Sequence, residues 1–333
     1  MHNQNVLVTG GGGFLGRAVV RKLLEEGARV TSFSRQYYPE LCHSRVAQIQ
    51  GDLADKKAVI QAVSGVDTVF HVAAKAGIWG KRDDFFRANV TGTQHVIQAC
   101  LDNGVKRLVH TSSPSVVFHG GDMEGVDESV PYPERYHAVY PETKAMAEQM
   151  VKKAGAGGLD TIILRPHLIW GPGDTHLVPQ LIKRAKTLKK IGSGKNRVDT
   201  IYVENAATAH ILACKALARN PDLSGNIYFI SQDQPVNLWQ MVDNILACAG
   251  VPPVKGAVSA RSAVAAGAVF ECFFSLLKIE KEPPMTSFAA RELSTSHWFD
   301  ISRAKKDLGY RPEISIEEGL ALLAASFGSK RRE

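Results

Sequence analysis

The sequence predicts an α/β protein: a doubly wound parallel-sheet (Rossmann) domain with a smaller, mostly helical C-terminal substrate lobe. An apolar, β-branched segment at residues 6–8 runs into four consecutive glycines and then into a helical pattern that extends to residue 26. Strand-like and helical segments alternate from there to residue 164, as in βαβ units of a parallel sheet. The 333 residues exceed the usual size of one domain, so a second lobe is expected.

The glycine-rich turn is the most informative motif. Gly10, Gly13 and Gly16 lie three residues apart, a spacing that permits a tight turn, close approach of a pyrophosphate and close helix packing. The helix that opens with Phe14 and Leu15 offers free N–H groups and a partial positive charge to phosphates. A plain flexible loop is the alternative, but the position between a strand and a helix favours a dinucleotide site.

The second strand is predicted at residues 29–33 and bears on the choice of cofactor. A carboxylate at its end would accept hydrogen bonds from the adenosine ribose and select NAD. Ser34 and Arg35 occupy that place instead, and an arginine can pair with a 2′-phosphate through two hydrogen bonds. We therefore expect NADP(H), with a surface arginine on a loop as the alternative.

The third strand, predicted at residues 46–50, leads to Asp52 and Leu53. Asp52 is placed to meet the adenine edge of the cofactor. An aspartate that precedes a helix is also a common N-cap, and residues 56–63 have a helical pattern, so both roles stay open for Asp52.

The fourth strand is predicted at residues 67–71 and is followed by Ala73 and Ala74. Small residues at the carboxyl end of a strand allow a cofactor to pass close to the backbone. Residues 85–103 then have a long helical pattern with one apolar side, and Asn89 falls within it.

The fifth strand, predicted at residues 106–111, delivers three serines to the carboxyl edge of the sheet: Ser112, Ser113 and Ser115. Hydroxyl groups at this edge either cap a turn or hold a substrate carbonyl. The residues alone leave both roles open.

Tyr140 and Lys144 lie four residues apart on a helix whose first turn contains Pro141, so they share one helix face. Tyrosine is a poor proton donor or base at neutral pH because its pKa is near 10. A neighbouring ammonium group and a cationic nicotinamide both lower that pKa. A surface Tyr/Lys pair is the alternative, but the glycine turn and the serine-ended strand favour a catalytic pair.

A strong turn at residues 171–174 marks the start of the second lobe, and residues 226–231 are predicted as a last strand that returns to the main sheet. The expected division is therefore discontinuous. The cofactor-binding domain is assigned residues 1–170 and about 198–232, and the substrate-binding lobe about 171–197 and 233–333.

Residues 263–277 form a markedly apolar segment in this lobe, with Phe270, Phe273 and Phe274 among its members. At about 15 residues, with Glu271 inside, it is too short for the ~20 residues of a membrane-spanning helix. We favour a helix buried in the lobe. The alternative is an apolar lid over a lipid-like substrate.

The composition excludes several classes of function. The net charge of +7 comes from dispersed basic residues, which gives little support to a nucleic-acid role but suits anionic ligands. The five cysteines form no CxxC pair and have no metal-ligand spacing with histidine, so we expect no metal site and a reducing compartment. No signal peptide is recognised before the first strand, and a cytoplasmic location without a membrane span is expected.

Four motifs together resemble the extended short-chain dehydrogenases/reductases, over nearly the whole chain. They are Thr-Gly-x-x-Gly-Phe-x-Gly at 9–16, Gly-Asp-Leu at 51–53, the serine-ended strand and Tyr-x-x-x-Lys. Within that superfamily the chain is similar to the 3β-hydroxysteroid dehydrogenase-type branch. Three stretches, residues 71–80, 164–174 and 315–319, are closer still to bacterial enzymes of olefin biosynthesis that reduce 2-alkyl-3-ketoalkanoic acids with NADPH.

The resemblance implies a role for each catalytic residue. Tyr140 would be the general acid, Lys144 would lower its pKa and hold the nicotinamide ribose, and Ser113 would position the carbonyl oxygen, although Ser112 and Ser115 lie beside it. The expected NADP(H)-binding residues are Gly10, Gly13, Phe14, Leu15, Gly16, Ser34, Arg35, Asp52, Leu53, Ala73, Ala74, Tyr140, Lys144 and Pro166.

The implied substrate is a long-chain, acyl-derived β-keto acid, whose 3-keto group is reduced to the 3-hydroxy acid. Lys75, Arg165 and His167 are candidates to face its carboxylate, although packing roles are common for the last two. The rival functions are a 3β-hydroxysteroid or 4-carboxysterol 3-dehydrogenase (decarboxylating) that uses NAD(P), a dihydroflavonol-type reductase and a non-catalytic NADP sensor. Candidate protein partners are a second copy of the chain and other enzymes of the pathway.

Overall fold

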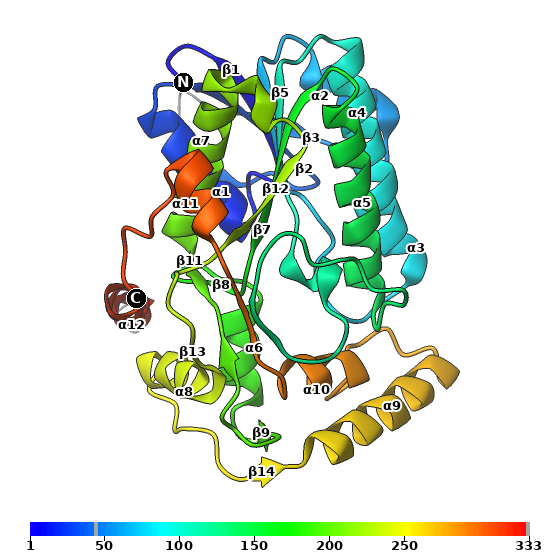
Figure 1. The fold of residues 1–333 in the computed structure, drawn as a ribbon, viewed down its shortest axis with the longest axis vertical. Coiled ribbons are helices and arrows are strands. Elements are labelled where there is room, and N and C mark those ends of the chain that lie inside the picture. Colours follow the sequence, from blue (N-terminus) through cyan, green and yellow to red (C-terminus); the bar gives the residue numbers. More distant parts are fainter. Residues whose placement is uncertain (43–45, 331–333) are drawn as a thin grey trace.

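The computed structural model describes residues 1–42 and 46–330 (Figure 1). Its centre is a seven-stranded sheet in the order β12-β7-β5-β4-β1-β2-β3, and all neighbouring strands in it are parallel. The strand order reverses between β1 and β4, so a crevice forms at the carboxyl ends of these two strands. The predicted doubly wound Rossmann architecture is confirmed.

The strands of this sheet are short, and all except the edge strand β3 are largely buried, as expected for a parallel sheet covered on both faces. They are β1 (Asn5–Thr9), β2 (Arg29–Ser34), β3 (Val46–Gln50), β4 (Thr68–His71), β5 (Arg107–Thr111), β7 (Asp160–Pro166) and β12 (Asn226–Ile230). The last of these returns to the sheet beside β7, as the sequence predicts.

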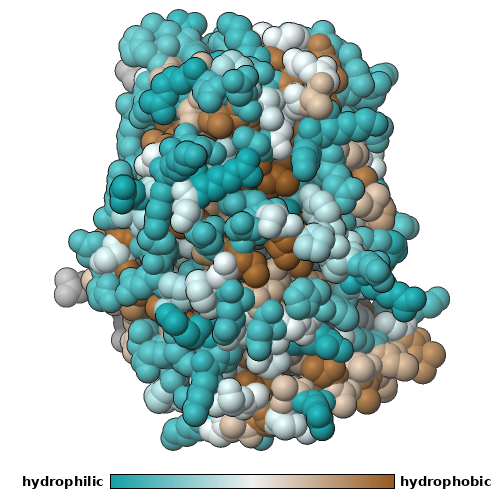
Figure 2. All heavy atoms as spheres, viewed as in Figure 1, coloured by the Kyte–Doolittle hydropathy of each residue, from teal (hydrophilic) through white to brown (hydrophobic). Residues whose placement is uncertain are grey.

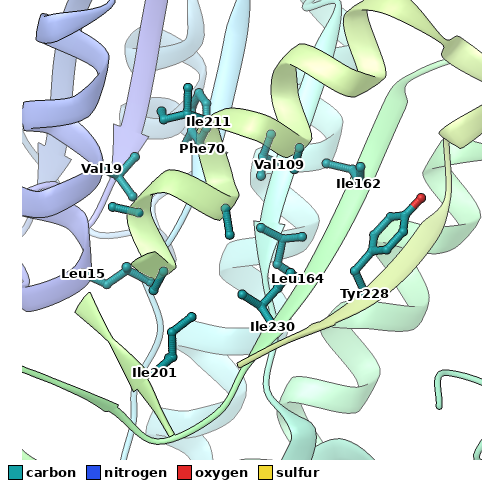
Figure 3. Packing of buried hydrophobic residues seen from close by; sticks show 14 of the residues in the cluster. Leu15, Val19, Phe70, Val109, Ile162, Leu164, Ile201, Ile211, Tyr228 and Ile230 are labelled. Atoms are coloured by element: carbon teal, nitrogen blue, oxygen red, sulfur yellow. The ribbon is translucent and has the colours of Figure 1, made fainter. Parts of the chain in front are cut away.

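Two groups of helices cover the two faces of the sheet (Figure 1). One face carries α1 (Phe14–Glu25), α7 (Val203–Arg219) and α11 (Ser302–Leu308), and the other carries α2 (Lys56–Val63), α4 (Gly92–Asp102) and α5 (Val139–Gly155). In the core of the first face, Leu15 and Val19 of α1 and Ile211 of α7 pack over the apolar side chains of the central strands (Figure 3). Helix α1, which follows the glycine turn, and helix α5 are thus anchored to one sheet.

The helical pattern predicted at 85–103 is interrupted in the structure. It consists of α3 (Arg82–Phe85), a π-helical stretch (Phe86–Thr91) and then α4. The Thr93 hydroxyl donates a hydrogen bond to the Asn89 carbonyl oxygen at 2.6 Å, within this widened turn. A side-chain hydroxyl therefore uses a backbone carbonyl of the helix as its acceptor. The helical spacing of apolar residues in the sequence does not reveal this interruption.

The C-terminal part of the chain adds small sheets and further helices. A four-stranded sheet has the order β13 (Val236–Asn237), β10 (Arg197–Val198), β15 (His297–Phe299) and β6 (Met123–Val126). Two short pairs join β11 (Ile201–Tyr202) to β8 (Ile169–Trp170) and β14 (Ala257–Val258) to β9 (Lys190–Ile191). Strands of two to four residues are too short for a recognisable alternation, which is why the sequence analysis missed them.

The remaining helices are α6 (Leu177–Arg184), α8 (Leu238–Cys248), α9 (Ala260–Leu276), α10 (Ser287–Glu292) and α12 (Ile316–Lys330), with short 3₁₀ turns at Pro39–Leu41, Pro114–Val117 and Pro221–Leu223. Within the described residues, no helix is both long and apolar enough to cross a membrane.

The favoured prediction of a buried helix at 263–277 is wrong. In α9 only Ala263 and Gly267 are buried, whereas Val269 is 67%, Phe273 54% and Leu276 79% exposed. Figure 2 shows the resulting apolar surface along this helix at the lower right of the molecule. Helix α9 packs closely against the start of α10 at Gly267. A Cβ at this position would come within 2.5 Å of the Ser287 nitrogen.

Candidate active site

The glycine turn has the geometry that a pyrophosphate requires. Gly10 has a φ of +70°, and a Cβ there would come within 2.9 Å of the Ala73 Cα, so the turn lies directly against the end of β4. A Cβ at Gly16 would overlap the Gly10 carbonyl group. Gly13 is exposed and precedes α1 with no side-chain cap. The N–H groups of the first turn, Phe14 and Leu15 included, therefore have no side-chain acceptor, which fits a bound phosphate.

The end of β2 is free to contact the adenosine part of a cofactor. Ser34 closes the strand, and its buried hydroxyl has no hydrogen-bond partner in residues 1–42 and 46–330. Arg35 is exposed beyond it, and no ion pair or hydrogen bond of its guanidinium occurs within the described ranges. These residues fit a group that carries a phosphate on the ribose, although neither excludes NAD.

Asp52 and Leu53 differ in their surroundings. Leu53 is buried, whereas the exposed Asp52 carboxylate accepts a hydrogen bond from the Ala54 N–H at 2.9 Å. Helix α2 is capped by Asp55, which accepts from the N–H groups of Lys57 and Ala58. The alternative in which Asp52 is the N-cap is therefore wrong, because the cap lies three residues further along.

Buried hydrogen bonds tie the end of β1 to the helix that follows β4. The Thr93 hydroxyl donates to Asn89, so it accepts from His71 Nε2, 2.9 Å away. His71 Nδ1 then accepts from the Thr9 hydroxyl at 2.8 Å, and Thr9 Oγ1 accepts from the Ala73 N–H at 3.2 Å. Burial lowers the pKa of His71 to about 3, so the ring is neutral and carries one N–H. His71 therefore donates to Thr93 and accepts from Thr9.

Asn89 is a site residue to which the sequence analysis assigned no role. Its side chain accepts from the Lys75 N–H at 2.7 Å and donates to the Lys75 carbonyl at 3.1 Å. It also donates to the Thr143 hydroxyl at 3.0 Å, on helix α5. Asn89 therefore joins the segment after Ala73 and Ala74 to α5. An asparagine within an apolar helical pattern is the only sequence signal of this role.

Tyr140 and Ser113 come together at the carboxyl edge of the sheet. Ser113 follows β5 and Tyr140 lies in the first turn of α5, and the Ser113 side chain is close enough to the phenol to lower its pKa. The Ser113 hydroxyl also contacts the Ser115 hydroxyl at 2.9 Å and accepts from the Ser115 N–H. The buried hydroxyl of Ser112 has no hydrogen-bond partner among the described residues. Among the three serines, Ser113 is the one that contacts the tyrosine.

Lys144 lies one turn further along α5 and is buried. Its ammonium group donates to the Thr111 carbonyl at 2.6 Å, and burial lowers its pKa to about 8. Burial raises the pKa of Tyr140 to about 12, Glu292 adds to the rise, and the Ser113 side chain opposes it. The chain's own groups therefore keep the phenol protonated, rather than lowering its pKa as expected from the sequence.

Three buried histidines, His71, His110 and His210, lie near Lys144 or near its partner Thr111. His71 and His110 face each other across β4 and β5 with ring centroids 5.2 Å apart, and His210 accepts from the Thr111 hydroxyl at 2.8 Å. Neither ring nitrogen of His110 has a partner. Burial and the positive charge of Lys144 hold the pKa of His110 well below its usual range, so this cluster is uncharged at neutral pH.

The predicted carboxylate-binding candidates are mostly engaged elsewhere. Arg165 forms two hydrogen bonds with the buried Glu148 carboxylate, at 2.9 and 2.6 Å, and His167 donates to His297 Nδ1 at 2.7 Å. Lys75 pairs with Asp84 at 3.6 Å. Pro166, between Arg165 and His167, ends β7 at the edge where the cofactor is expected. Arg165 and His167 therefore have the packing roles that were the alternative.

Comparison with known proteins gives consistent matches. A sequence model of the 3-beta hydroxysteroid dehydrogenase/isomerase family matches residues 7–257. A 2-alkyl-3-oxoalkanoate reductase of Stenotrophomonas maltophilia (strain K279a) is 50% identical over 326 residues, which cover 96% of this chain and 98% of that protein. A decarboxylating sterol-4-alpha-carboxylate 3-dehydrogenase of Mus musculus is 34% identical over 333 residues, which cover 98% of this chain and 91% of that protein. The solved structure of MoeE5 in complex with UDP-glucuronic acid and NAD matches with a TM-score of 0.75 at 25% identity, covering 99% of this chain and 100% of that chain.

Proposed function

Because this chain belongs to the 3-beta hydroxysteroid dehydrogenase/isomerase family, we propose that it reduces the 3-keto group of a long-chain 2-alkyl-3-ketoalkanoic acid to the 3-hydroxy acid, with NADPH, in olefin biosynthesis. The chain is an oxidoreductase of the extended short-chain dehydrogenase/reductase type. The observation that carries the proposal is the contact of Tyr140 with Ser113, with Lys144 one turn away. The higher identity to a keto acid reductase than to a sterol dehydrogenase supports the keto acid as substrate.

In the proposed reaction, Tyr140 donates its phenolic proton to the carbonyl oxygen of the substrate. The Ser113 hydroxyl donates a second hydrogen bond to the same oxygen, where negative charge develops. NADPH, when bound, supplies the hydride to the carbonyl carbon. A pKa of about 12 suits Tyr140 to this direction, because a proton donor must be protonated at the start. Lys144 places a positive charge near the phenolate that remains.

Two features of the chain support NADPH rather than NADH. No carboxylate follows β2 at the position where one would bind the adenosine ribose. The exposed guanidinium of Arg35 and the unpartnered hydroxyl of Ser34 occupy this position instead. A 2′-phosphate would supply acceptors for both groups.

The apolar surface of α9 supports a substrate with long alkyl arms. The Phe274 ring of this helix packs edge-on against the Trp79 ring, with centroids 6.3 Å apart. Trp79 belongs to the segment that follows Ala73 and Ala74, and its indole N–H donates to the Ile279 carbonyl at 3.1 Å. The end of α9 is thereby joined to the segment that leaves the proposed cofactor site. We propose that alkyl chains lie along this helix, which exposes Phe273 and Leu276.

The proposal is tested by incubating the purified protein with NADPH or NADH and three carbonyl substrates, a 2-alkyl-3-ketoalkanoic acid, a 3-ketosteroid and a flavanone. Absorbance of the reduced nicotinamide follows turnover. We expect the keto acid to be reduced with NADPH at the highest kcat/KM. A preference for the steroid with NAD(H) would favour the sterol dehydrogenase, and a protein that turns over none of the three would contradict the reductase assignment.

A further inference from the structure

Arg291, in α10, is a half-buried arginine that has no acidic partner. Its Nε atom is buried without a hydrogen-bond partner, and its guanidinium takes part in no ion pair or side-chain hydrogen bond in the part of the chain that the structure describes. Arg165, by contrast, is neutralised by Glu148, and Arg184 by Glu282. An anion from outside the chain would supply an acceptor for this buried N–H and a partner for the positive charge.

Helix α10 places the aliphatic part of the Arg291 side chain beside the segment that follows Ser113. The Phe288 ring of α10 packs edge-on against Phe118, with centroids 5.9 Å apart. A Cβ at Gly120 would lie 3.5 Å from Arg291 Cδ, so Arg291 lines the backbone just beyond the turn that Ser113 opens. Helix α10 therefore lies along residues 118–120.

The neighbouring residue ties the same helix to the catalytic tyrosine. The Glu292 carboxyl lies close enough to Tyr140 to raise the pKa of the phenol. The position of α10 is well defined, because the Glu271 carboxylate of α9 accepts from the Ser287 N–H at 2.9 Å and from its hydroxyl. His297 also donates to the Glu292 carbonyl at 2.9 Å. Arg291 is thus held beside Gly120 by a short helix that is anchored near both of its ends.

We propose that Arg291 binds the carboxylate of the substrate and so selects β-keto acids over neutral ketones. The inference rests on the proposed function. In a 3-keto acid one carbon separates the carboxyl carbon from the keto carbon, so the carboxylate must bind close to Tyr140 and Ser113. A guanidinium fits a carboxylate through two parallel hydrogen bonds.

The charge of Glu292 is compatible with this role. It forms no ion pair with Arg291 among the described residues, and burial raises its pKa to about 7. Near neutral pH a large fraction of Glu292 is therefore uncharged, and it competes little with a substrate carboxylate for the guanidinium. Arg165 and His167 are already paired and Lys75 has Asp84 as a partner, whereas Arg291 has no acidic partner among the described residues.

The test uses the reverse reaction, because β-keto acids decarboxylate spontaneously in solution. Wild type, Arg291→Gln and Arg291→Lys are assayed with NADP⁺ on a 2-alkyl-3-hydroxyalkanoic acid and on its methyl ester. Loss of a charge-assisted contact of ~1.5–3 kcal/mol corresponds to about tenfold or more in affinity. We expect Arg291→Gln to raise KM for the acid by about this factor and to leave the ester nearly unchanged, with Arg291→Lys between wild type and Arg291→Gln on the acid.

Arg311→Gln, at an exposed position, is the matched control and should leave both substrates unchanged. Equal effects of Arg291→Gln on acid and ester, or no effect on either, would overturn the carboxylate role while leaving the reductase function intact. A wild-type protein that oxidises neither compound would overturn the proposed function itself, and the inference with it. A melting curve for each variant identifies loss of folding, in which case the comparison of Arg291→Lys on the two substrates decides.

Discussion

The Lys144 ammonium group donates a hydrogen bond to the Thr111 carbonyl oxygen, 2.6 Å away, and only 3% of the lysine is exposed. This contact fixes the lysine of α5 to the end of β5, one residue before Ser112 and Ser113. Because Thr111 also donates to His210, the lysine is held by a polar cluster that reaches through the sheet to α7. The position of the ammonium group is thus determined by three elements far apart in the sequence.

We expect Lys144→Met to weaken NADPH binding and to lower kcat. The variant removes a positive charge that would stabilise the Tyr140 phenolate and a donor proposed to hold the nicotinamide ribose. A nicotinamide fluorescence titration measures the first effect and steady-state assays measure the second. An unchanged Kd for NADPH would contradict the contact with the ribose.

Tyr140→Phe should lower turnover by about 10²–10⁴ while cofactor affinity stays nearly intact, because general acid catalysis typically contributes a factor of this size. Tyr136→Phe is a suitable control. Its hydroxyl donates to the Val116 carbonyl at 3.2 Å rather than to Ser113, so a much smaller effect is expected. Wild-type turnover by Tyr140→Phe, with chemistry rate-limiting, would show that another group donates the proton.

Arg35→Ala should weaken NADPH by about tenfold or more and leave NADH almost unchanged, since only NADPH carries the 2′-phosphate and a charge-assisted contact contributes ~1.5–3 kcal/mol. Arg29→Ala is the matched control, because Arg29 is also exposed but lies at the opposite end of the same strand. Equal losses for both cofactors would mean that Arg35 does not read the 2′-phosphate.

Glu292→Gln should make the protein more stable at pH 8 than wild type and have little effect at pH 4. Burial raises the pKa of Glu292 from 4.5 to about 7, so between these values the folded protein binds more protons than the unfolded chain. The free energy of unfolding therefore falls as pH rises through this window, and glutamine removes the fall. Melting temperatures at both pH values measure the difference, with the exposed Glu134→Gln as control. A destabilised variant at pH 8 would show that the ionised carboxylate is favourable in the fold.

Phe273→Ser should raise KM for long-chain substrates and spare short ones, with little change in the melting temperature. Phe273 is 54% exposed, so the substitution leaves no cavity, and each methylene that a substrate buries contributes ~0.8 kcal/mol. Leu101→Ser, which alters a residue 44% exposed on α4, should change neither quantity. If neither variant changes the KM for long-chain substrates, α9 does not take part in substrate binding.

The sequence by itself determined the doubly wound sheet and the place of the glycine turn. Both depend on local patterns: β-branched strands that are buried on both faces, and a glycine at position 10 whose φ of +70° other residues rarely adopt. It also placed Tyr140 and Lys144 on one helix face, because residues four apart on a helix are neighbours whatever the rest of the chain does.

Only the tertiary structure decided which polar residues are free and which are paired. His167 is hydrogen-bonded to His297, which lies 130 residues further along the chain. Glu292, which helps to raise the pKa of Tyr140, belongs to α10 in the C-terminal part of the chain. Most apolar residues of α9 were expected inside and lie outside, because the helix buries only a narrow side, at Ala263 and Gly267, against its surroundings. Pairing and exposure depend on what arrives from distant parts of the chain, and no local period carries that information.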